Sequence, residues 1–403
     1  MADILFLVHR LPYPPNKGDK VRSYNLLKHL ARQHRVFLGT FIDDPDDERH
    51  IATVRTLCAD VHVARLDPRI ARFRSLSSLL AGEALTLGYY RSSALRNWVN
   101  ETCRRRHIDT AVIFSSAMAQ YLEEQPRIPM IIDFVDVDSA KWTQYAPQHR
   151  WPLSRLYRRE GKLLLDYERR MAARASRSFF ATDNEVALFT RNAPECRVRV
   201  QAMGNGVDTD YFSVDDTRSS PFPPGELPVV FTGAMDYLPN VDAATWFASD
   251  VLPGLLQRWP AVRFYVVGRN PSAAVLALAS DRIVVTGTVD DVRPYLQHAA
   301  TVVAPLRIAR GIQNKILEAM AMGRPVIASA TCAAAVDAVA GQELLTATSP
   351  EEYIAAISQV LEAPETATAM GGAARQRVVE RYTWEAHMKA IDPYLPAPSL
   401  RET

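Results

Sequence analysis

The chain has 403 residues, more than one hydrophobic core usually supports, so we expect two domains of about 200 residues each. Apolar residues make up 48% and charged residues 23%, which is typical of a globular protein, and no run of about 18 apolar residues offers a membrane span. The formal net charge is only +2, although residues 1–200 hold 32 Lys and Arg against 23 Asp and Glu and the remainder holds 15 against 22. The small net charge argues against a nucleic-acid binder. The basic first half and the acidic second half indicate different partners for the two halves.

The cysteines and the first residues indicate the compartment. The four cysteines are scattered and form no C-x-x-C pair, which argues against a disulfide framework and a zinc site. The apolar run at the start, MADILFLVHRLP, is too short for a signal peptide, and it predicts a first strand. We therefore expect a cytoplasmic protein.

Strand and helix patterns alternate through the first half of the chain. Short apolar runs predict strands at residues 4–8, 36–41, 61–64, 110–114, 130–134 and 178–181. Apolar residues at helical spacing predict helices at residues 21–30, 70–81, 91–105 and 152–175. Such alternation is typical of a doubly wound sheet of parallel strands.

A turn-rich segment at residues 213–228 is the best linker candidate, and the alternation restarts after it. The predicted strands are residues 229–233, 263–268, 283–287, 301–305, 325–329 and 344–346. The predicted helices are residues 241–256, 291–299 and 312–320, with further helices to the end. The predicted class is α/β, with two doubly wound domains whose ligands bind in the cleft between them.

The segment ARGIQNKILEAM, residues 309–320, has helical periodicity between two predicted strands. Its apolar residues gather on one side, and Gly311, Lys315 and Glu318 gather on the other. The amino end of this helix could receive a diphosphate, with Arg310 at the entrance and Lys315 one turn in. Glu318 could then accept hydrogen bonds from vicinal hydroxyls. The alternative is an exposed Lys–Glu pair, worth only about a few tenths of a kcal/mol.

The loop HRLPYPPNKGDK follows the first predicted strand, on the ligand side of a doubly wound domain. A glycine here lets a ligand approach the backbone, and the cations beside a helix start favour an anion or a sugar. The residues predicted on this acceptor side are His9, Lys17, Gly18, Lys20 and Arg22. The alternative is a solvated loop that only turns the chain.

The segment IIDFVDVDSAKW places three carboxylates at the end of a predicted strand. They could bind a sugar or assist proton transfer, and we predict Asp133 as a catalytic candidate and Asp138 on the acceptor side. Alternatively, Asp138 or Ser139 caps the helix that follows. The spacing lacks the octahedral ligand set of a Mg²⁺ site, so we expect no metal.

A basic stretch at residues 150–177 holds nine basic and three acidic residues, with Trp151 and Leu153 among them. It could lie on an anionic membrane. The alternative is an amphipathic helix packed on the sheet.

Several segments resemble a known family. LEAMAMGRPVIAS closely resembles the donor block of family-4 GT-B glycosyltransferases, which are retaining enzymes that use nucleotide-activated sugars. GNGVD resembles the start of that family's second domain, VVTGTVDDVRPYL its base-binding turn, and RYTWEAHMKAIDPYL the closing helix that crosses back to the first domain. HRLPYPPNKGDKVRSYNLLKHLA, IDFVDVDSAKW and FTGAMDYLPNVDAATWF resemble the sugar transferases associated with exosortase (PEP-CTERM) exopolysaccharide systems.

The resemblance implies a GT-B fold with an acceptor-side domain at residues 1–205, completed by 383–403, and a donor domain at 206–382. It implies retaining, metal-independent transfer of a sugar from a nucleotide diphosphate, with no cofactor, to a glycan or lipid-linked hydroxyl. We predict Lys315, Arg310 and Asp133 as catalytic. The predicted donor-binding residues are Gly233, Val289, Arg307, Gly311, Ile312, Gln313, Asn314 and Glu318.

The chain departs from the family pattern at several positions. Arg310 stands where the family has the first of two glutamates, and Asn240 stands about where its first donor loop has a Lys. We expect Arg307, Arg310 and Lys315 to compensate by meeting the same phosphates. The catalytic His that the family often has is not assignable in IFSSAMAQY. The alternatives are therefore a nucleotide-sugar 2-epimerase of the same fold and a non-catalytic nucleotide-sugar or carbohydrate binder.

Overall fold

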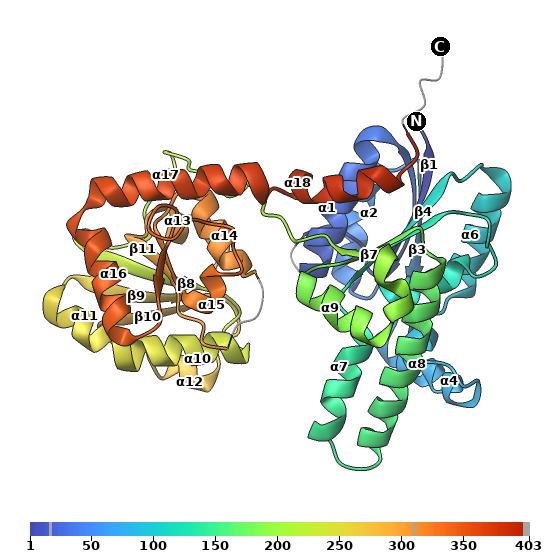
Figure 1. The fold of residues 1–403 in the computed structure, drawn as a ribbon, viewed down its shortest axis with the longest axis horizontal. Coiled ribbons are helices and arrows are strands. Elements are labelled where there is room, and N and C mark those ends of the chain that lie inside the picture. The colour runs from blue at the N-terminus through green and yellow to red at the C-terminus, as the bar shows by residue number, and fades with distance from the viewer. Residues whose placement is uncertain (16–17, 309–311, 398–403) are drawn as a thin grey trace. The chain divides into compact units, whose positions relative to one another are not determined.

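The computed structural model describes residues 1–15, 18–308 and 312–397, which form two compact units (Figure 1). The first unit comprises Met1–Asn205 and the residues from His387 onward, and the second comprises Gly206–Ala386. Each unit holds one hydrophobic core around one parallel sheet. The predicted α/β class with two doubly wound domains is confirmed.

The first unit is built on seven parallel strands in the order β3-β2-β1-β4-β5-β6-β7. The strands are β1 (Asp3–Val8), β2 (Arg35–Ile42), β3 (Asp60–Arg65), β4 (Thr110–Phe114), β5 (Met130–Val135), β6 (Arg177–Phe180) and β7 (Val200–Ala202). Every residue of β1 and β4 is buried, as expected for central strands that helices cover on both faces.

The helices of the first unit connect these strands. They are α1 (Gly18–Gln33), α2 (Ile51–Arg55), α3 (Pro68–Ser75), α4 (Ser77–Leu80), α5 (Leu85–Tyr89), α6 (Ser93–Arg105), α7 (Asp138–Tyr145), α8 (Leu153–Arg174) and α9 (Asp183–Asn192). Ser92 caps α6 and Thr182 caps α9 by accepting backbone hydrogen bonds. Figure 1 shows α7 and α8 as a packed helical pair that extends beyond the sheet.

The second unit is built on six parallel strands in the order β10-β9-β8-β11-β12-β13. The strands are β8 (Leu227–Thr232), β9 (Val262–Val267), β10 (Ile283–Gly287), β11 (Thr301–Ala304), β12 (Val326–Ser329) and β13 (Leu345–Ala347). The helices are α10 (Leu238–Trp246), α11 (Leu252–Arg258), α12 (Ala273–Leu276), α13 (Arg293–Gln297), α14 (Asn314–Ala321), α15 (Ala330–Ala333), α16 (Pro350–Glu362) and α17 (Pro364–Arg381). The short helix α18 (Trp384–Met388) begins in the second unit and ends in the first.

The turn-rich segment at residues 213–228 is not the linker. It belongs to the second unit, where the ring of Phe222 lies 4.6 Å from that of Tyr265 and Gln297 Nε2 donates a 2.8 Å hydrogen bond to the Asp215 carbonyl. The composition that suggested a linker therefore belongs to a loop packed on its own domain. The predicted closing helix is also interrupted: α18 gives way to a 3₁₀ helix at Lys389–Tyr394, which contains Pro393.

Candidate functional site

Two glycines bring backbone and side chains close together at the carboxyl ends of β8 and β9. A Cβ atom on Gly268 would lie 1.6 Å from the carbonyl oxygen of Gly233, so only glycine fits. A Cβ on Gly233 would lie 2.7 Å from Asn240 Nδ2 and 2.9 Å from Lys315 Nζ. The bare backbone of Gly233 therefore makes room for the Lys315 ammonium at the end of the strand.

Lys315 reaches from α14 to the first turn of α10. Its Nζ donates a 2.6 Å hydrogen bond to Asn240 Oδ1 and lies 4.2 Å from the centroid of the Phe231 ring. Asn240 is itself fixed, because its Nδ2 donates a 2.8 Å hydrogen bond to the Ala234 carbonyl. Asn240, which stands about where the sequence resemblance predicted a lysine, thus holds Lys315 of α14 in place.

The pKa values of Lys315 and Glu318 are strongly shifted in opposite directions. Burial lowers the pKa of Lys315 to about 7, although the charge of Glu318 acts in the other direction. Burial raises the pKa of Glu318 to about 7, although the charge of Lys315 acts against it. Such a pair of perturbed groups at strand ends is typical of a functional site, and an anion beside Lys315 would restore its positive charge.

The predicted base-binding turn supplies a second cluster beside Glu318. The guanidinium of Arg293 lies 4.0 Å from the centroid of the Tyr211 ring and forms a 2.8 Å ion pair with Asp291. Burial raises the pKa of Tyr211, and the charges of Asp291 and Glu318 add to this rise. Sequence reasoning did not select Tyr211, Asp291 or Arg293 as site residues. The signals were the position of Asp291 and Arg293 inside VVTGTVDDVRPYL and that of Tyr211 shortly after GNGVD.

Arg307 also reaches α10, where its guanidinium pairs with Asp242 at 2.5 Å and lies 5.5 Å from the Trp246 ring centroid. Arg307 and Lys315 thus meet α10 two residues apart, at Asp242 and Asn240. Arg310 and Gly311 lie outside the described residues, so the expected set of three cations remains a prediction.

The other predicted donor residues lie around the start of α14 and the turn after β10. Ile312 and Val289 are half-buried and pack against the core of the second unit. Gln313 is the N-cap residue of α14, and Asn314, its first residue, is exposed. The roles of these four residues in donor binding stay predictions.

Two predicted acceptor-side cations have a different role in the structure. Lys20 Nζ pairs with Asp47 Oδ2 at 2.6 Å, and both side chains are buried. Arg22 Nε and Nη2 donate to the two carboxylate oxygens of Asp133 at 2.7 and 3.1 Å, with each side chain only 1% exposed. Arg22 Nη1 also donates to the Gly204 carbonyl and to Asn205 Oδ1. These buried pairs fix α1 to its neighbours.

The same contacts correct the prediction for Asp133. Both of its oxygens accept hydrogen bonds from a buried guanidinium, so this carboxylate is not available to take a proton or to bind a sugar. Asp138, by contrast, begins α7 and forms a 3.1 Å ion pair with Lys141, whose ammonium also contacts Asp136 at 2.9 Å.

The predicted loop residue His9 lies in a polar cluster after β1. Its Nε2 is 3.4 Å from Asp19 Oδ2, and its ring stacks on Phe114 at the end of β4. Arg10 donates to Asp19 at 2.7 Å. Although burial acts to raise the pKa of Asp19, the hydrogen bond from His9 and the Arg10 charge hold it well below its usual range.

Gly18 is the first residue of α1. A Cβ on Gly18 would meet no atom within 4 Å. Lys17 lies outside the described residues.

Backbone strain marks the same edge of the first sheet. Ser115, directly after β4, has φ of 78°, and Val135, the last residue of β5, has φ of 69°. A β-branched residue in this region is a genuine outlier, and such strain gathers at functional sites.

Among the described residues, no three His, Cys, Asp or Glu side chains come together as metal ligands would. Within the same ranges, no helix has both the length and the hydropathy to cross a bilayer.

Comparison with known proteins finds a family resemblance within the second unit. Residues 226–363 match the family described as glycosyl transferases group 1. The matched region spans β8 to α16 and includes Asn240, Lys315 and Glu318. No curated protein sequence matches the chain.

Solved structures match over the whole length. HepE of Anabaena in complex with UDP superposes with a TM-score of 0.66 at 16% identity, covering 98% of this chain and 99% of that one. Sucrose-phosphate synthase of Thermosynechococcus elongatus gives 0.66 at 18% identity, with 98% of each chain covered. WaaG, a glycosyltransferase involved in lipopolysaccharide biosynthesis, gives 0.60 at 16% identity, with 97% and 99% covered. The chain has the GT-B fold.

Proposed function

We propose that the protein is a glycosyltransferase that moves a sugar from a nucleotide diphosphate to a hydroxyl acceptor. The observation that carries this proposal is the Lys315 ammonium, held by Asn240 at the end of β8 with Glu318 one turn further along α14. The group 1 match over residues 226–363 supports it. Solved structures of the similar HepE contain UDP and UDP-glucose, which fits a nucleotide-sugar donor here.

The proposed chemistry requires stabilisation of the departing diphosphate, which gains negative charge as the glycosidic bond breaks. The Lys315 ammonium and the backbone N–H groups at the start of α14 would supply it without a protein nucleophile. The leaving phosphate would help to deprotonate the incoming hydroxyl, so that the anomeric configuration is retained. We propose that no metal takes part. Because Asp133 is paired with Arg22, we no longer assign it a catalytic role.

The direct test of this function is a two-stage screen. Nucleotide sugars are first ranked by thermal stabilisation of the protein, and nucleotide release is then followed with a lipid extract as acceptor. Acceptor-dependent release is the expected result. A 2-epimerase would convert the donor without an acceptor, and a non-catalytic binder would be stabilised but release no nucleotide.

Glu318→Ala is expected to weaken nucleoside-diphosphate binding by about tenfold or more, because a carboxylate that accepts ribose hydroxyls makes a charged hydrogen bond. Isothermal calorimetry with UDP measures the change. Glu365→Ala on α17, which removes an exposed carboxylate of the second unit, is the control. Unchanged affinity in Glu318→Ala would remove Glu318 from the site.

Nucleotide binding is expected to take up a proton at pH about 8. Lys315 has a pKa of about 7 in the unliganded structure, and a nearby diphosphate favours the ammonium form. Calorimetry in two buffers of different ionisation enthalpy measures the uptake, which should approach one proton and fall strongly in Lys315→Met. Equal uptake in the variant would show that another group titrates.

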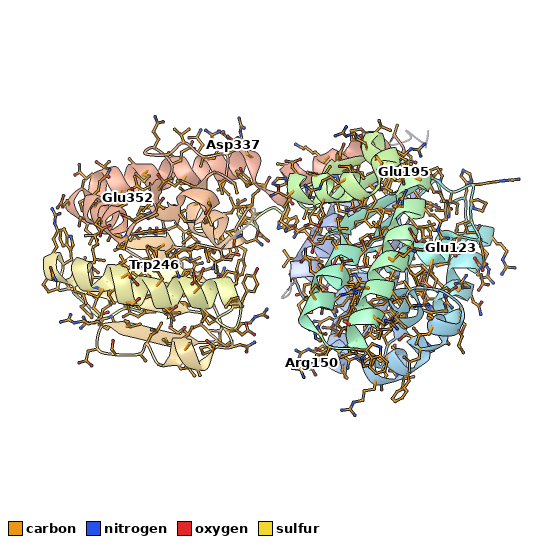
Figure 2. All side chains as sticks on the ribbon, turned by 60° about the horizontal axis from the view of Figure 1, so that its bottom comes forward. Glu123, Arg150, Glu195, Trp246, Asp337 and Glu352 are labelled. Atoms are coloured by element: carbon orange, nitrogen blue, oxygen red, sulfur yellow. The ribbon has the colours of Figure 1, made fainter. Side chains whose placement is uncertain are left out.

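We also propose a lipid-linked or growing exopolysaccharide acceptor and contact with the inner face of the cytoplasmic membrane. The support is an exposed apolar and basic surface on α3 and α4. Its apolar members are Ile70, Phe73, Leu76 and Leu80, and its arginines are Arg69, Arg72 and Arg74. Phe73 is 80% and Leu80 94% exposed. Trp151, in the loop between α7 and α8 next to Arg150 (Figure 2), is 74% exposed. Apolar side chains among arginines fit an anionic bilayer surface.

Phe73→Ala combined with Leu80→Ala is expected to lower binding to anionic vesicles by about tenfold or more, because both side chains would leave the acyl boundary. Co-sedimentation at low salt measures it. Val198→Ala, which truncates another apolar side chain that is 79% exposed in the first unit, is the control. If the unmodified protein fails to co-sediment, the membrane proposal is wrong.

A further inference from the structure

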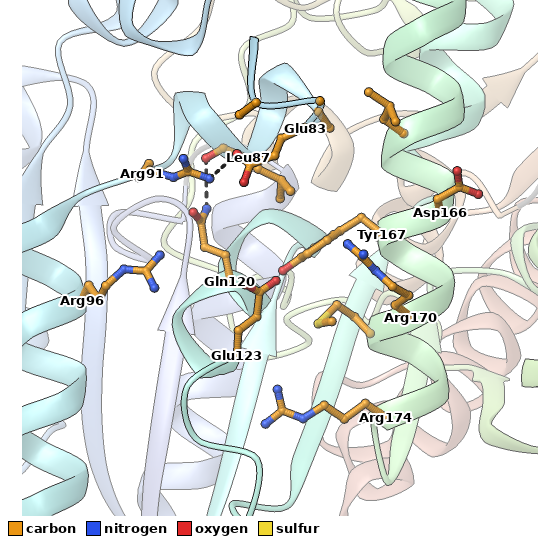
Figure 3. A pocket seen from close by; sticks show the side chains of 15 residues that line it. Glu83, Leu87, Arg91, Arg96, Gln120, Glu123, Asp166, Tyr167, Arg170 and Arg174 are labelled. Atoms are coloured by element: carbon orange, nitrogen blue, oxygen red, sulfur yellow. Dashed lines mark hydrogen bonds and ion pairs between the residues drawn. The ribbon is translucent and has the colours of Figure 1, made fainter. Parts of the chain in front are cut away.

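The first unit contains a cavity of about 710 Å³ that the proposed reaction does not use (Figure 3). It lies between the first turn of α6, the C-terminal half of α8, residues 81–91 and residues 120–123, and it shares no lining residue with the candidate site described above. Its volume lies within the range of about 300–1,000 Å³ that is typical of small-molecule sites.

The cavity is lined by an unusual number of charged side chains. Four are arginines and three are carboxylates. Arg91 pairs with Glu83 at 2.6 Å, and Arg96 pairs at 2.8 Å with Glu124, which is not a lining residue.

The other four charged side chains of the cavity have no such partner. Within the described parts of the chain, Arg170, Arg174, Glu123 and Asp166 form no ion pair. Arg174 Nη2 donates a 2.8 Å hydrogen bond to the Gln125 carbonyl, which does not neutralise its charge. Two cations and two carboxylates that lack an ion-pair partner in the described parts of the chain therefore line the cavity.

Two buried polar side chains that line the cavity each have an oxygen without a hydrogen-bond partner among the described residues. Tyr167 is 1% and Gln120 is 2% exposed, and neither the Tyr167 hydroxyl nor Gln120 Oε1 has a hydrogen-bond partner among the described residues. Gln120 is held in place, since its Nε2 donates to the carbonyls of Ala117 and Leu87 at 2.8 and 3.1 Å. Buried polar atoms are normally paired, so each of these implies a partner that the chain does not supply.

The Tyr167 side chain ends beside Gln120 and Glu123 (Figure 3). Figure 3 shows Tyr167 reaching from α8 toward Gln120 and Glu123, with Arg174 extending into the cavity below it. Burial raises the pKa of Tyr167 well above its usual value, the Glu123 charge adds to the rise, and the Arg170 and Arg174 charges oppose it. The hydroxyl thus lies within electrostatic reach of both signs of charge.

We propose that this cavity binds an anionic carbohydrate, a sugar that carries a phosphate or a carboxylate. Arg170 and Arg174 would hold the anionic group, because guanidinium groups match carboxylate and phosphate geometry. Glu123, Asp166 and the Gln120 carbonyl would accept hydrogen bonds from sugar hydroxyls. The mixture of free cations and free carboxylates fits such a ligand better than a plain anion, which the carboxylates would repel.

The test is calorimetric titration of the full chain, without any nucleotide sugar, with four probes: glucose 6-phosphate, glucuronate, glucose and inorganic phosphate. At least one of the two sugar anions is expected to bind at least about tenfold more tightly than glucose and inorganic phosphate. Absence of binding by both sugar anions, or equal affinity for inorganic phosphate, would overturn the proposal. Because no donor is present, the result is independent of whether the protein transfers sugars.

Variants separate the cavity from the surface of the protein. The double variant Arg170→Ala/Arg174→Ala and the single variant Tyr167→Phe are each expected to weaken binding by about tenfold or more. Tyr167→Phe should leave the melting temperature unchanged, since the hydroxyl has no partner among the described residues. Arg155→Ala, on an exposed part of α8 outside the cavity, should bind normally. Unchanged binding in both cavity variants would contradict the assignment.

Discussion

Lys315→Ala is expected to lower kcat/KM by about 10²-fold or more, the scale of losing one preorganised contact to a charge that develops in the transition state. Lys315 is the single lysine of the second unit, and its ammonium is held at the end of β8 by Asn240. Initial rates of nucleotide release, with the donor and acceptor found by screening, measure the effect.

Two further variants sharpen this test. Arg258→Ala removes an exposed cation of the second unit that is paired with Glu362, and it should leave the rate nearly unchanged. Asn240→Ala leaves Lys315 in place but removes its partner, so it should give an intermediate loss if the position of the ammonium matters. Near-normal turnover of Lys315→Ala would discard the catalytic role.

Asp133→Ala is expected to destabilise the first unit by about 3–5 kcal/mol, because it leaves the guanidinium of Arg22 buried without its counter-charge. The effect is large because Arg22 connects α1 both to β5 and to residues 204–205, where the chain leaves the first unit. Urea unfolding, followed separately by probes in each unit, measures the loss.

The control for this variant is Asp136→Ala, which removes a carboxylate paired at 2.9 Å with the half-exposed Lys141 and should change stability by less than about 1 kcal/mol. Replacing both partners with apolar residues, Arg22→Met/Asp133→Leu, should recover much of the loss. If Asp133→Ala unfolds at the same urea concentration as the unmodified protein, the buried pair contributes little to stability.

Periodicity predicted the sheets well because buried parallel strands are short apolar runs. The predicted bounds of β4 (Thr110–Phe114) and β10 (Ile283–Gly287) are those of the structure. By contrast, β7 (Val200–Ala202) was not predicted, because three residues show no measurable alternation. The equally short β13 (Leu345–Ala347) was predicted only from its apolar residues. The prediction of a linker at residues 213–228 was wrong because a loop packed on its own domain can have the same composition as a linker.

The sequence could not show which side chains of the site contact one another. Arg22 and Asp133 are 111 positions apart, and each was predicted as a ligand-side residue, since a charged residue near a strand end looks the same whether it is paired or free. The contact between Asn240 and Lys315, 75 positions apart, was equally invisible. The apolar side of α14 was predictable, and its Ile316, Leu317 and Met320 are fully buried.

The central claim is that the amino end of α14 receives the diphosphate of a sugar nucleotide. The most direct measurement is a crystal structure of the protein with a bound nucleoside diphosphate. We predict that its phosphates lie within hydrogen-bond distance of Lys315 Nζ and the first amides of α14, and that Glu318 faces the ribose hydroxyls. A nucleotide bound elsewhere, with Lys315 and Glu318 turned away from it, would contradict the account.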